Sequence, residues 1–162
     1  MPLKDGDPAE RGDVWLRNLI DKKWILNDGT VSQNAFKGKK FFSAPEEAKK
    51  RPWQHEASGR LRSLAKDIDA EGEAFCKKVT QKDGRFGGVM YASVVALARD
   101  FGAINADVAF TPNDDPAHAD IAFYKSTEAD LDTLRDELQK LMKGAKPGQY
   151  AQLDALVNLS SK

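Results

Sequence analysis

The strongest helical pattern in the chain lies between Gln54 and Thr80. Apolar and small residues recur there at steps of three and four, so a helix would carry them on one face: Leu61, Leu64, Ala65, Ile68, Gly72, Phe75, Cys76 and Val79. Most of the charged residues of this stretch fall outside the stripe. The pattern predicts a core helix over this range, in which Gly72 marks either close packing or a break.

A second amphipathic helix is predicted from about Ser126 to Gly144. Its apolar stripe consists of five residues: Leu131, Leu134, Leu138, Leu141 and Met142. Ser126 or Thr127 is the expected N-cap, and the acidic residues that follow complement the helix dipole. After Pro147 a shorter helix is expected to dock on the domain through three residues: Tyr150, Leu153 and Leu156.

Residues 13–26 fit either a strand or a helical stripe, and we favour an extended start. Further strands are predicted where apolar and polar residues alternate, in residues 89–92, 106–112 and 117–125. The last two form a hairpin around the turn sequence NDDP, and Asp28-Gly29 is a second tight-turn signal. Ser43 and Ser93 are the expected N-caps of two short helices. These elements predict one α+β domain, in which a small, mainly antiparallel sheet packs against two main amphipathic helices.

Composition fits a single domain of 162 residues, which we assign to residues 13–162, after a flexible leader at residues 1–12. The chain is 41% hydrophobic and 31% charged, and its formal net charge is zero. It therefore lacks the low hydrophobicity and high net charge that are typical of a disordered chain. No apolar run approaches the roughly 20 residues that span a bilayer. The leader has no apolar signal-peptide region, and the single Cys76 cannot form an internal disulfide. We therefore expect a cytoplasmic protein without membrane contact.

Two histidines are present, and one of them begins the motif His118-Ala-Asp120 within a predicted strand. Alternation places His118, Asp120 and Tyr124 on one face, while Ala119, Ile121 and Phe123 supply the apolar face behind. A carboxylate orients an imidazole and favours its cation, so these three residues are the candidate catalytic group. The alternative is a polar strand face with no chemistry. The catalytic hypothesis requires a second polar group near His118, for which we consider His55 and Arg17.

Other chemistry has little support in the residues. His55 opens the sequence HEASG, but the second histidine of a zinc-protease motif is replaced by Gly59, so no metal site is predicted. Cys76 shares the apolar stripe and is expected to be packed rather than reactive. The glycine-rich sequence QKDGRFGG lacks the lysine of a Walker loop. It is expected to be a turn, with a phosphate contact through Arg85 as the alternative. No cofactor is indicated.

Charge is distributed unevenly along the chain. From Lys22 to Lys66 there are eleven Lys and Arg against four Asp and Glu, and the later part is acidic. In the first part cations alternate with aromatic residues, a pattern typical of surfaces that contact phosphates and stack on unpaired bases. The candidate ligand-binding residues are Phe36, Lys37, Lys39, Lys40, Lys49, Arg51 and Trp53. The alternative is an edge strand with aromatic residues inward and lysines outward.

Two patches, DGTVSQNAFK at residues 28–37 and DDPAHADI at residues 114–121, resemble a loose set of small bacterial proteins. Those proteins share a D-G-x-V-S-x-x-A-F-K element and a later P-A-H-A-x-I element. The resemblance brings no activity, cofactor or ligand with it. It implies a bacterial cytoplasmic protein, with an accessory role in a phage-defence or mobile-element locus as the expected context.

The leading hypothesis from the sequence is a non-enzymatic binding module. It would use its basic, aromatic surface against nucleic acid, another polyanion or an acidic protein partner. The alternative is a small enzyme or nucleotide-binding protein, with His118 as the acid–base group and Asp120 as its orienting partner. The oligomeric state is left open by the sequence.

Overall fold

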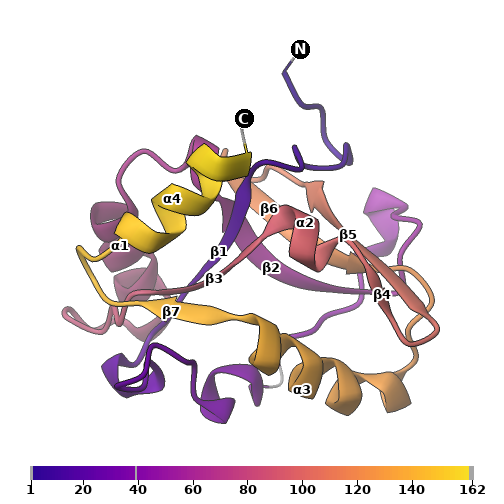
Figure 1. The fold of residues 1–162 in the computed structure, drawn as a ribbon. Helices are drawn as coiled ribbons and strands as arrows, with labels where there is room; N and C mark the ends of the chain where they lie inside the picture. The colour runs from indigo at the N-terminus through magenta and orange to yellow at the C-terminus, as the bar shows by residue number, and fades with distance from the viewer. Residues whose placement is uncertain (1, 39, 161–162) are drawn as a thin grey trace.

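A computed structural model describes residues 2–38 and 40–160 and shows a seven-stranded antiparallel sheet with four α-helices (Figure 1). The strands are β1 Val14–Asn18, β2 His55–Leu61, β3 Val89–Ser93, β4 Asp100–Phe101, β5 Ile104–Phe110, β6 His118–Phe123 and β7 Lys143–Ala145. Their order across the sheet is β4-β5-β6-β2-β1-β3-β7. The helices are α1 Ile68–Thr80, α2 Val94–Leu97, α3 Leu131–Leu141 and α4 Ala151–Ser160. The predicted α+β class is confirmed.

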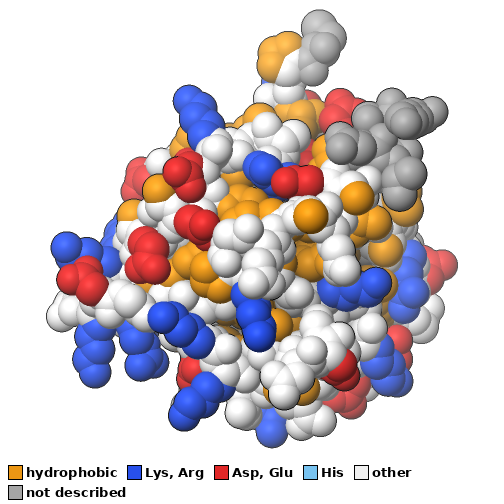
Figure 2. Space-filling model, turned by 60° about the vertical axis from the view of Figure 1, so that its left-hand side comes forward, with side chains coloured by type: hydrophobic (Ala, Val, Ile, Leu, Met, Phe, Trp, Pro, Cys, Tyr) orange, Lys and Arg blue, Asp and Glu red, His pale blue; other side chains and the backbone are white. Residues whose placement is uncertain are grey.

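The two longest helices lie against opposite faces of the sheet. Leu131, Leu134 and Leu138 of α3 pack into the main core, together with Trp15 of β1. On the other face, Ile68 and Cys76 of α1 and Leu153 of α4 pack on Val14, Leu16, Val89 and Tyr91. Seen from a viewpoint turned towards this second side, hydrophobic side chains fill the middle of the surface and charged ones border it (Figure 2). A separate core cluster on the same face, around Trp53 and Ala122, contains no described residue of α1 or α4.

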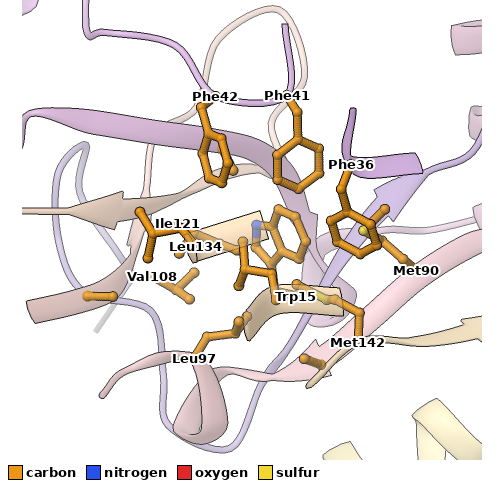
Figure 3. Close-up of a cluster of buried hydrophobic side chains, with 14 of the residues drawn as sticks. Trp15, Phe36, Phe41, Phe42, Met90, Leu97, Val108, Ile121, Leu134 and Met142 are labelled. Carbon is orange, nitrogen blue, oxygen red and sulfur yellow. The ribbon is translucent and has the colours of Figure 1, made fainter. Parts of the chain in front are cut away.

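The main core is centred on Trp15 of β1 (Figure 3). Its indole is fully buried and donates a hydrogen bond from Nε1 to the backbone oxygen of Ala119, at 3.1 Å. The ring therefore crosses β2 from β1 to β6, and it passes over Gly59. A row of phenylalanines in tilted and edge-to-face contact continues this core: Phe36, Phe41, Phe42 and Phe123. Such ring pairs add to the stabilisation from burial alone.

The two helices predicted in residues 126–160 are present, but the first ends at Leu141, and Lys143 and Gly144, which were expected at its end, lie in β7. A 3-10 turn, Glu128–Asp130, leads into α3, and a capping box joins Thr127 to Asp130. The buried residues of α3 are Leu131, Leu134 and Leu138, as the stripe indicated. The shorter helix after Pro147 is also present as α4, with Leu153 buried.

The long helix predicted between Gln54 and Thr80 is wrong in its first half. Residues 55–61 form the strand β2, a 3-10 turn follows at Arg62–Leu64, and α1 begins at Ile68 after Asp67 caps it by accepting from the Ala70 amide. The predicted stripe fails within α1 as well, because Phe75 and Val79 are 42% and 53% exposed. Three- and four-residue spacings inside β2 arose by coincidence with its two-residue alternation.

The N-terminal residues 2–12 pack against the domain rather than forming a separate leader. Pro8 forms a β-bridge with Ala109, and the amides of Gly6 and Ala9 donate to backbone oxygens of β5. Ala9 is buried at 3% exposure. The expected helix after Ser43 is reduced to a 3-10 turn, Glu47–Lys49, that has no side-chain cap.

The predicted hairpin of residues 106–125 is confirmed as β5 and β6, which pair with Ala109 opposite Asp120. The strand predicted at residues 89–92 is confirmed as β3, and Ser93 caps α2 by accepting from the Ala96 amide. These outcomes place His118 and Asp120 on a central strand of the sheet.

We predict that Cys76 does not react with a thiol reagent such as DTNB in the native protein. Its thiol is fully buried, and burial raises its pKa, so little thiolate is present. Absorbance after mixing should stay at baseline until guanidinium unfolds the chain. Rapid labelling of native protein would contradict the packing of α1 on the sheet.

Candidate functional site

A group of polar side chains occupies the part of the second face that lies beside α1. Arg60 of β2 is paired with His118 of β6, and Ser58 with Asp120, and directly paired residues in an antiparallel sheet point to the same side. Thr111, just after β5, hydrogen-bonds to both His118 and Asp120. We call this group the polar strip; its members are Glu56, Ser58, Arg60, Thr111, His118 and Asp120.

Asp120 is the buried centre of the polar strip. Only 5% of its side chain is exposed. The Ser58 hydroxyl donates to Oδ1 at 3.1 Å, and the Thr111 hydroxyl donates to Oδ2 at 2.8 Å. A carboxylate taken out of water needs such donors, because an unsatisfied buried charge is costly. Two hydroxyl groups therefore hold this carboxylate in one orientation.

The hydrogen bonds of His118 fix its tautomer. Nδ1 lies 2.8 Å from the backbone oxygen of Thr111 and 3.0 Å from the Thr111 hydroxyl. A carbonyl oxygen can only accept, and the Thr111 proton is already directed to Asp120, so Nδ1 carries the imidazole proton. Nε2 of the neutral ring is then left with a free lone pair. The side chain is 18% exposed, so this lone pair belongs to a partly accessible imidazole.

Nε2 of His118 faces Oδ1 of Asp120 at 3.9 Å. Both atoms are acceptors when the ring is neutral, and the distance is too long for a direct hydrogen bond. Protonation of Nε2 would turn this arrangement into an attraction between opposite charges. The pair is thus able to accept a proton at Nε2 and to stabilise the resulting cation.

Glu56 is a second carboxyl group of the polar strip with a different environment. Burial raises its pKa, a hydrogen bond from the Trp53 indole opposes this, and the nearby Asp120 charge raises it further. The Trp53 Nε1 to Glu56 Oε1 distance is 2.8 Å. Glu56, partly buried beside the Trp53 indole, therefore has surroundings different from those of Asp120, which is held by two hydroxyl groups.

Arg60 connects the polar strip to two other parts of the fold. Its Nε and Nη2 donate to Asp115 at 2.6 and 3.1 Å, and Nη2 also donates to Glu71 of α1 at 2.9 Å. The remaining nitrogen, Nη1, is buried and has no hydrogen-bond partner among the described residues. The guanidinium charge is matched by these two carboxylates.

The candidate catalytic residues divide as follows. His118 and Asp120 share a face, as predicted. Tyr124 lies six positions along the chain from His118, about 20 Å in an extended strand, and packs against Trp53 instead. Tyr124 therefore does not lie beside His118, and its catalytic role stays a prediction.

Neither proposed second group lies beside the His118 imidazole. His55 is five positions from Arg60 on β2, about 17 Å away, and its ring nitrogens contact Ser126 at 2.7 Å and Glu128 at 3.2 Å. That trio resembles a nucleophilic triad in composition, but the Ser126 hydroxyl is buried. Arg17 lies over the Phe41 ring, on the α3 side of the sheet, where burial lowers its pKa to about 10.

Sequence reasoning missed Glu56, Ser58 and Arg60, because they lay inside the predicted helix. A signal for them was present. In HEASGRL, polar residues at 56, 58 and 60 alternate with Ala57, Gly59 and Leu61, which is the period of a half-buried strand.

The basic, aromatic surface is not arranged as predicted. Phe36 and Trp53 are 2% and 4% exposed, so neither ring has a face free for a base, and their predicted stacking role is wrong. Arg51 is paired with Asp5 at 2.8 Å and lies over Trp53. These aromatic side chains point inward because burying their large apolar area stabilises the core.

The lysines of that stretch have mixed surroundings. Lys37 lines an open pocket of about 400 Å³ together with Asp132 and Asp136, so the local charge there is not purely basic. Lys40 and Lys49 are exposed, and Lys39 lies outside the described residues. Arg85 is exposed on the loop between α1 and β3.

Within residues 2–38 and 40–160, no three His, Cys, Asp or Glu side chains are grouped closely enough to hold a metal ion. No helix of this part of the chain has the length and apolar character needed to cross a bilayer. Comparison of the chain with protein-family models, with curated proteins and with solved structures gave no significant match.

Proposed function

We propose that the polar strip is an acid–base site for a small polar substrate, with Nε2 of His118 as the base. The observation that carries this proposal is the fixed tautomer of His118, which leaves a lone pair on Nε2 of a partly exposed imidazole beside a buried carboxylate. This arrangement meets the geometric requirement for a general base, namely a proton acceptor with an orienting partner.

The other residues of the polar strip have supporting roles. Asp120 stabilises the imidazolium that forms when Nε2 takes a proton from the substrate. Glu56, whose pKa is raised, is the group that returns a proton to another atom of the substrate, so that the proton count of the site is unchanged. Glu56 and Arg60 are four positions apart on β2, about 13 Å, so acid and base contact different ends of the substrate.

The charges of the polar strip favour an uncharged or cationic substrate. Glu56 and Asp120 are carboxyl groups, and the Arg60 charge is already matched by Asp115 and Glu71. A phosphate-bearing ligand would meet repulsion here, which argues against a nucleotide as the substrate of this site.

The test of this proposal is carbethoxylation by diethyl pyrocarbonate, which attacks neutral imidazole nitrogens. We expect His118 to be modified at Nε2 at a rate comparable to a free imidazole at neutral pH. His55 should react far more slowly, because its side chain is 9% exposed and both of its nitrogens have partners. Peptide mass spectrometry of timed samples measures both rates in one protein.

Two variants complete the test. In His118→Gln the imidazole is removed, so the fast-reacting site should disappear and only the slow modification of His55 should remain. Ser126→Ala, which removes a partner of His55, is the matched control and should leave the rate of His118 modification unchanged. A His118 that resists the reagent as strongly as His55 does would show that Nε2 is not an accessible base, and the proposal would fail.

A further inference from the structure

A second surface of the molecule gathers positive charge at the ends of three neighbouring strands. The segment after β1 is joined to the segment before β3 by hydrogen bonds between Leu19 and residues 87–88. β7 is joined to the turn at residues 28–30 by the Gly144 amide, which donates to the Gly29 oxygen at 2.8 Å. These segments carry six cations, which we call the cationic end: Lys22, Lys23, Lys82, Arg85, Lys143 and Lys146.

The cations of the cationic end have no carboxylate partner, as is also true of exposed lysines elsewhere such as Lys49 and Lys125, but here three segments bring six of them to one end of the sheet. All six are exposed, and none of them forms an ion pair with another described residue. Elsewhere six arginines have a carboxylate partner: Arg11, Arg51, Arg60, Arg62, Arg99 and Arg135. Internal pairing therefore does not account for the positive charge gathered at this end of the sheet.

Three carboxylates lie in the same segments, so six positive and three negative charges leave an excess of three positive charges. Asp21 accepts from the Lys23 amide, and Asp28 accepts from the amide and hydroxyl of Thr30, which hold its pKa below the ordinary value. Asp83 faces Lys77 in the last turn of α1.

We infer that the cationic end binds the phosphate backbone of a nucleic-acid duplex. Unpaired, exposed Lys and Arg on converging loops supply contacts to phosphates and release of counterions, which drive sequence-independent binding. Binding to single strands relies in addition on aromatic platforms. Phe86 of the glycine-rich loop is 1% exposed, and Trp24, next to Lys23, is partly buried and packs against the main core, so neither ring lies free on the surface. The cationic end therefore favours duplex over single-stranded nucleic acid.

Binding should be strongly dependent on salt. If four to six of the cations contact phosphates, the logarithm of the association constant falls with the logarithm of salt concentration with a slope of about −4 to −5. Fluorescence anisotropy with a labelled duplex DNA of mixed sequence measures this slope directly. A duplex RNA of the same sequence, run in parallel, distinguishes the two sources of the backbone.

The decisive comparison is between two charge-reversal pairs. Lys22→Glu with Lys23→Glu should weaken binding by about tenfold or more, because two favourable phosphate contacts become repulsive. The matched control, Lys49→Glu with Lys125→Glu, makes the same change in net charge at two other exposed lysines and should bind nearly as wild type does. Circular dichroism of each variant checks that the fold is retained.

Three outcomes would overturn the inference. Equal loss of affinity in both pairs would show a general charge effect. Tighter binding to single-stranded DNA would point to stacking residues elsewhere. If vesicles of phosphatidylcholine and phosphatidylserine displaced the labelled duplex at a lower concentration of negative charge than unlabelled DNA does, a membrane surface would be the partner. The His118→Gln variant should bind DNA unchanged, so failure here and failure of the acid–base proposal are distinguishable.

Discussion

Replacing Gly59 by alanine is expected to destabilise the fold by about 3 kcal/mol or more, the upper range for overpacking a well-filled core. A Cβ at this position would overlap the indole ring of Trp15 and the backbone oxygen of Leu16. Neither neighbour can move easily, because the indole is fully buried and held by Ala119, and the backbone oxygen belongs to β1. The added methyl group must therefore separate β1 from β2 or displace Trp15.

Gly38→Ala is the matched control, since a Cβ there meets no atom within 4 Å and the backbone is not in the left-handed region. Urea unfolding followed by tryptophan fluorescence measures both variants. We expect the midpoint to move clearly for Gly59→Ala and to stay near that of wild type for Gly38→Ala. A Gly59→Ala protein as stable as wild type would mean that Trp15 does not cross β2 as described.

Gly59 also explains the largest error in reading this sequence. A glycine in a predicted helix is costly, and a glycine in a strand marks a close approach of another group. Residues 54–61 fit both the three- and four-residue spacing of a helix and the two-residue alternation of a strand. Because a helical pattern continues after Asp67, a helix is the expected structure for them as well. Only the tertiary partner, the ring of Trp15, decides between the two periods, and it lies far away in the sequence.

Other elements were accessible from local signals. Alternation around the NDDP turn predicted β5 and β6 because one side of each strand is apolar. For α3, the apolar spacing and the capping residues both indicate the same helix. His118 and Asp120 followed from the same alternation. Their hydrogen-bond partners could not be predicted in this way, because Ser58 lies on β2 and Thr111 just after β5. A single sequence carries no information on the register between strands.

The charges were harder still to interpret. An alternation of lysines with aromatic residues looks the same whether the rings face solvent or the core, and here Phe36 and Trp53 face inward. The cationic end was missed because its six cations come from three separate segments. No window of sequence contains them all, and the return of β7 to the start of β3 brings them together.

Arg60→Ala is expected to cost about 2 to 3 kcal/mol of stability, because it removes the partner of two carboxylates at once. Asp115 and Glu71 keep 32% and 34% of their side chains exposed, so water compensates part of the loss and the cost stays below that of breaking a fully buried pair. Arg62→Ala is the matched control. Its partner Asp154 is 43% exposed, and we expect a loss of about 1 kcal/mol or less.

The same variant should also change how stability depends on pH. Burial alone would raise the pKa of Asp115, but hydrogen bonds from Arg60 and the Ala117 amide outweigh it and hold the pKa below its ordinary value. The unfolded carboxyl group then binds a proton first as the pH falls, so this contribution is present at neutral pH and is lost below about pH 4. Urea midpoints measured from pH 7 down to pH 3 should fall more steeply for wild type than for Arg60→Ala. Equal slopes would show that Asp115 is stabilised by the 113–117 turn alone, and that Arg60 does not join that turn to the polar strip.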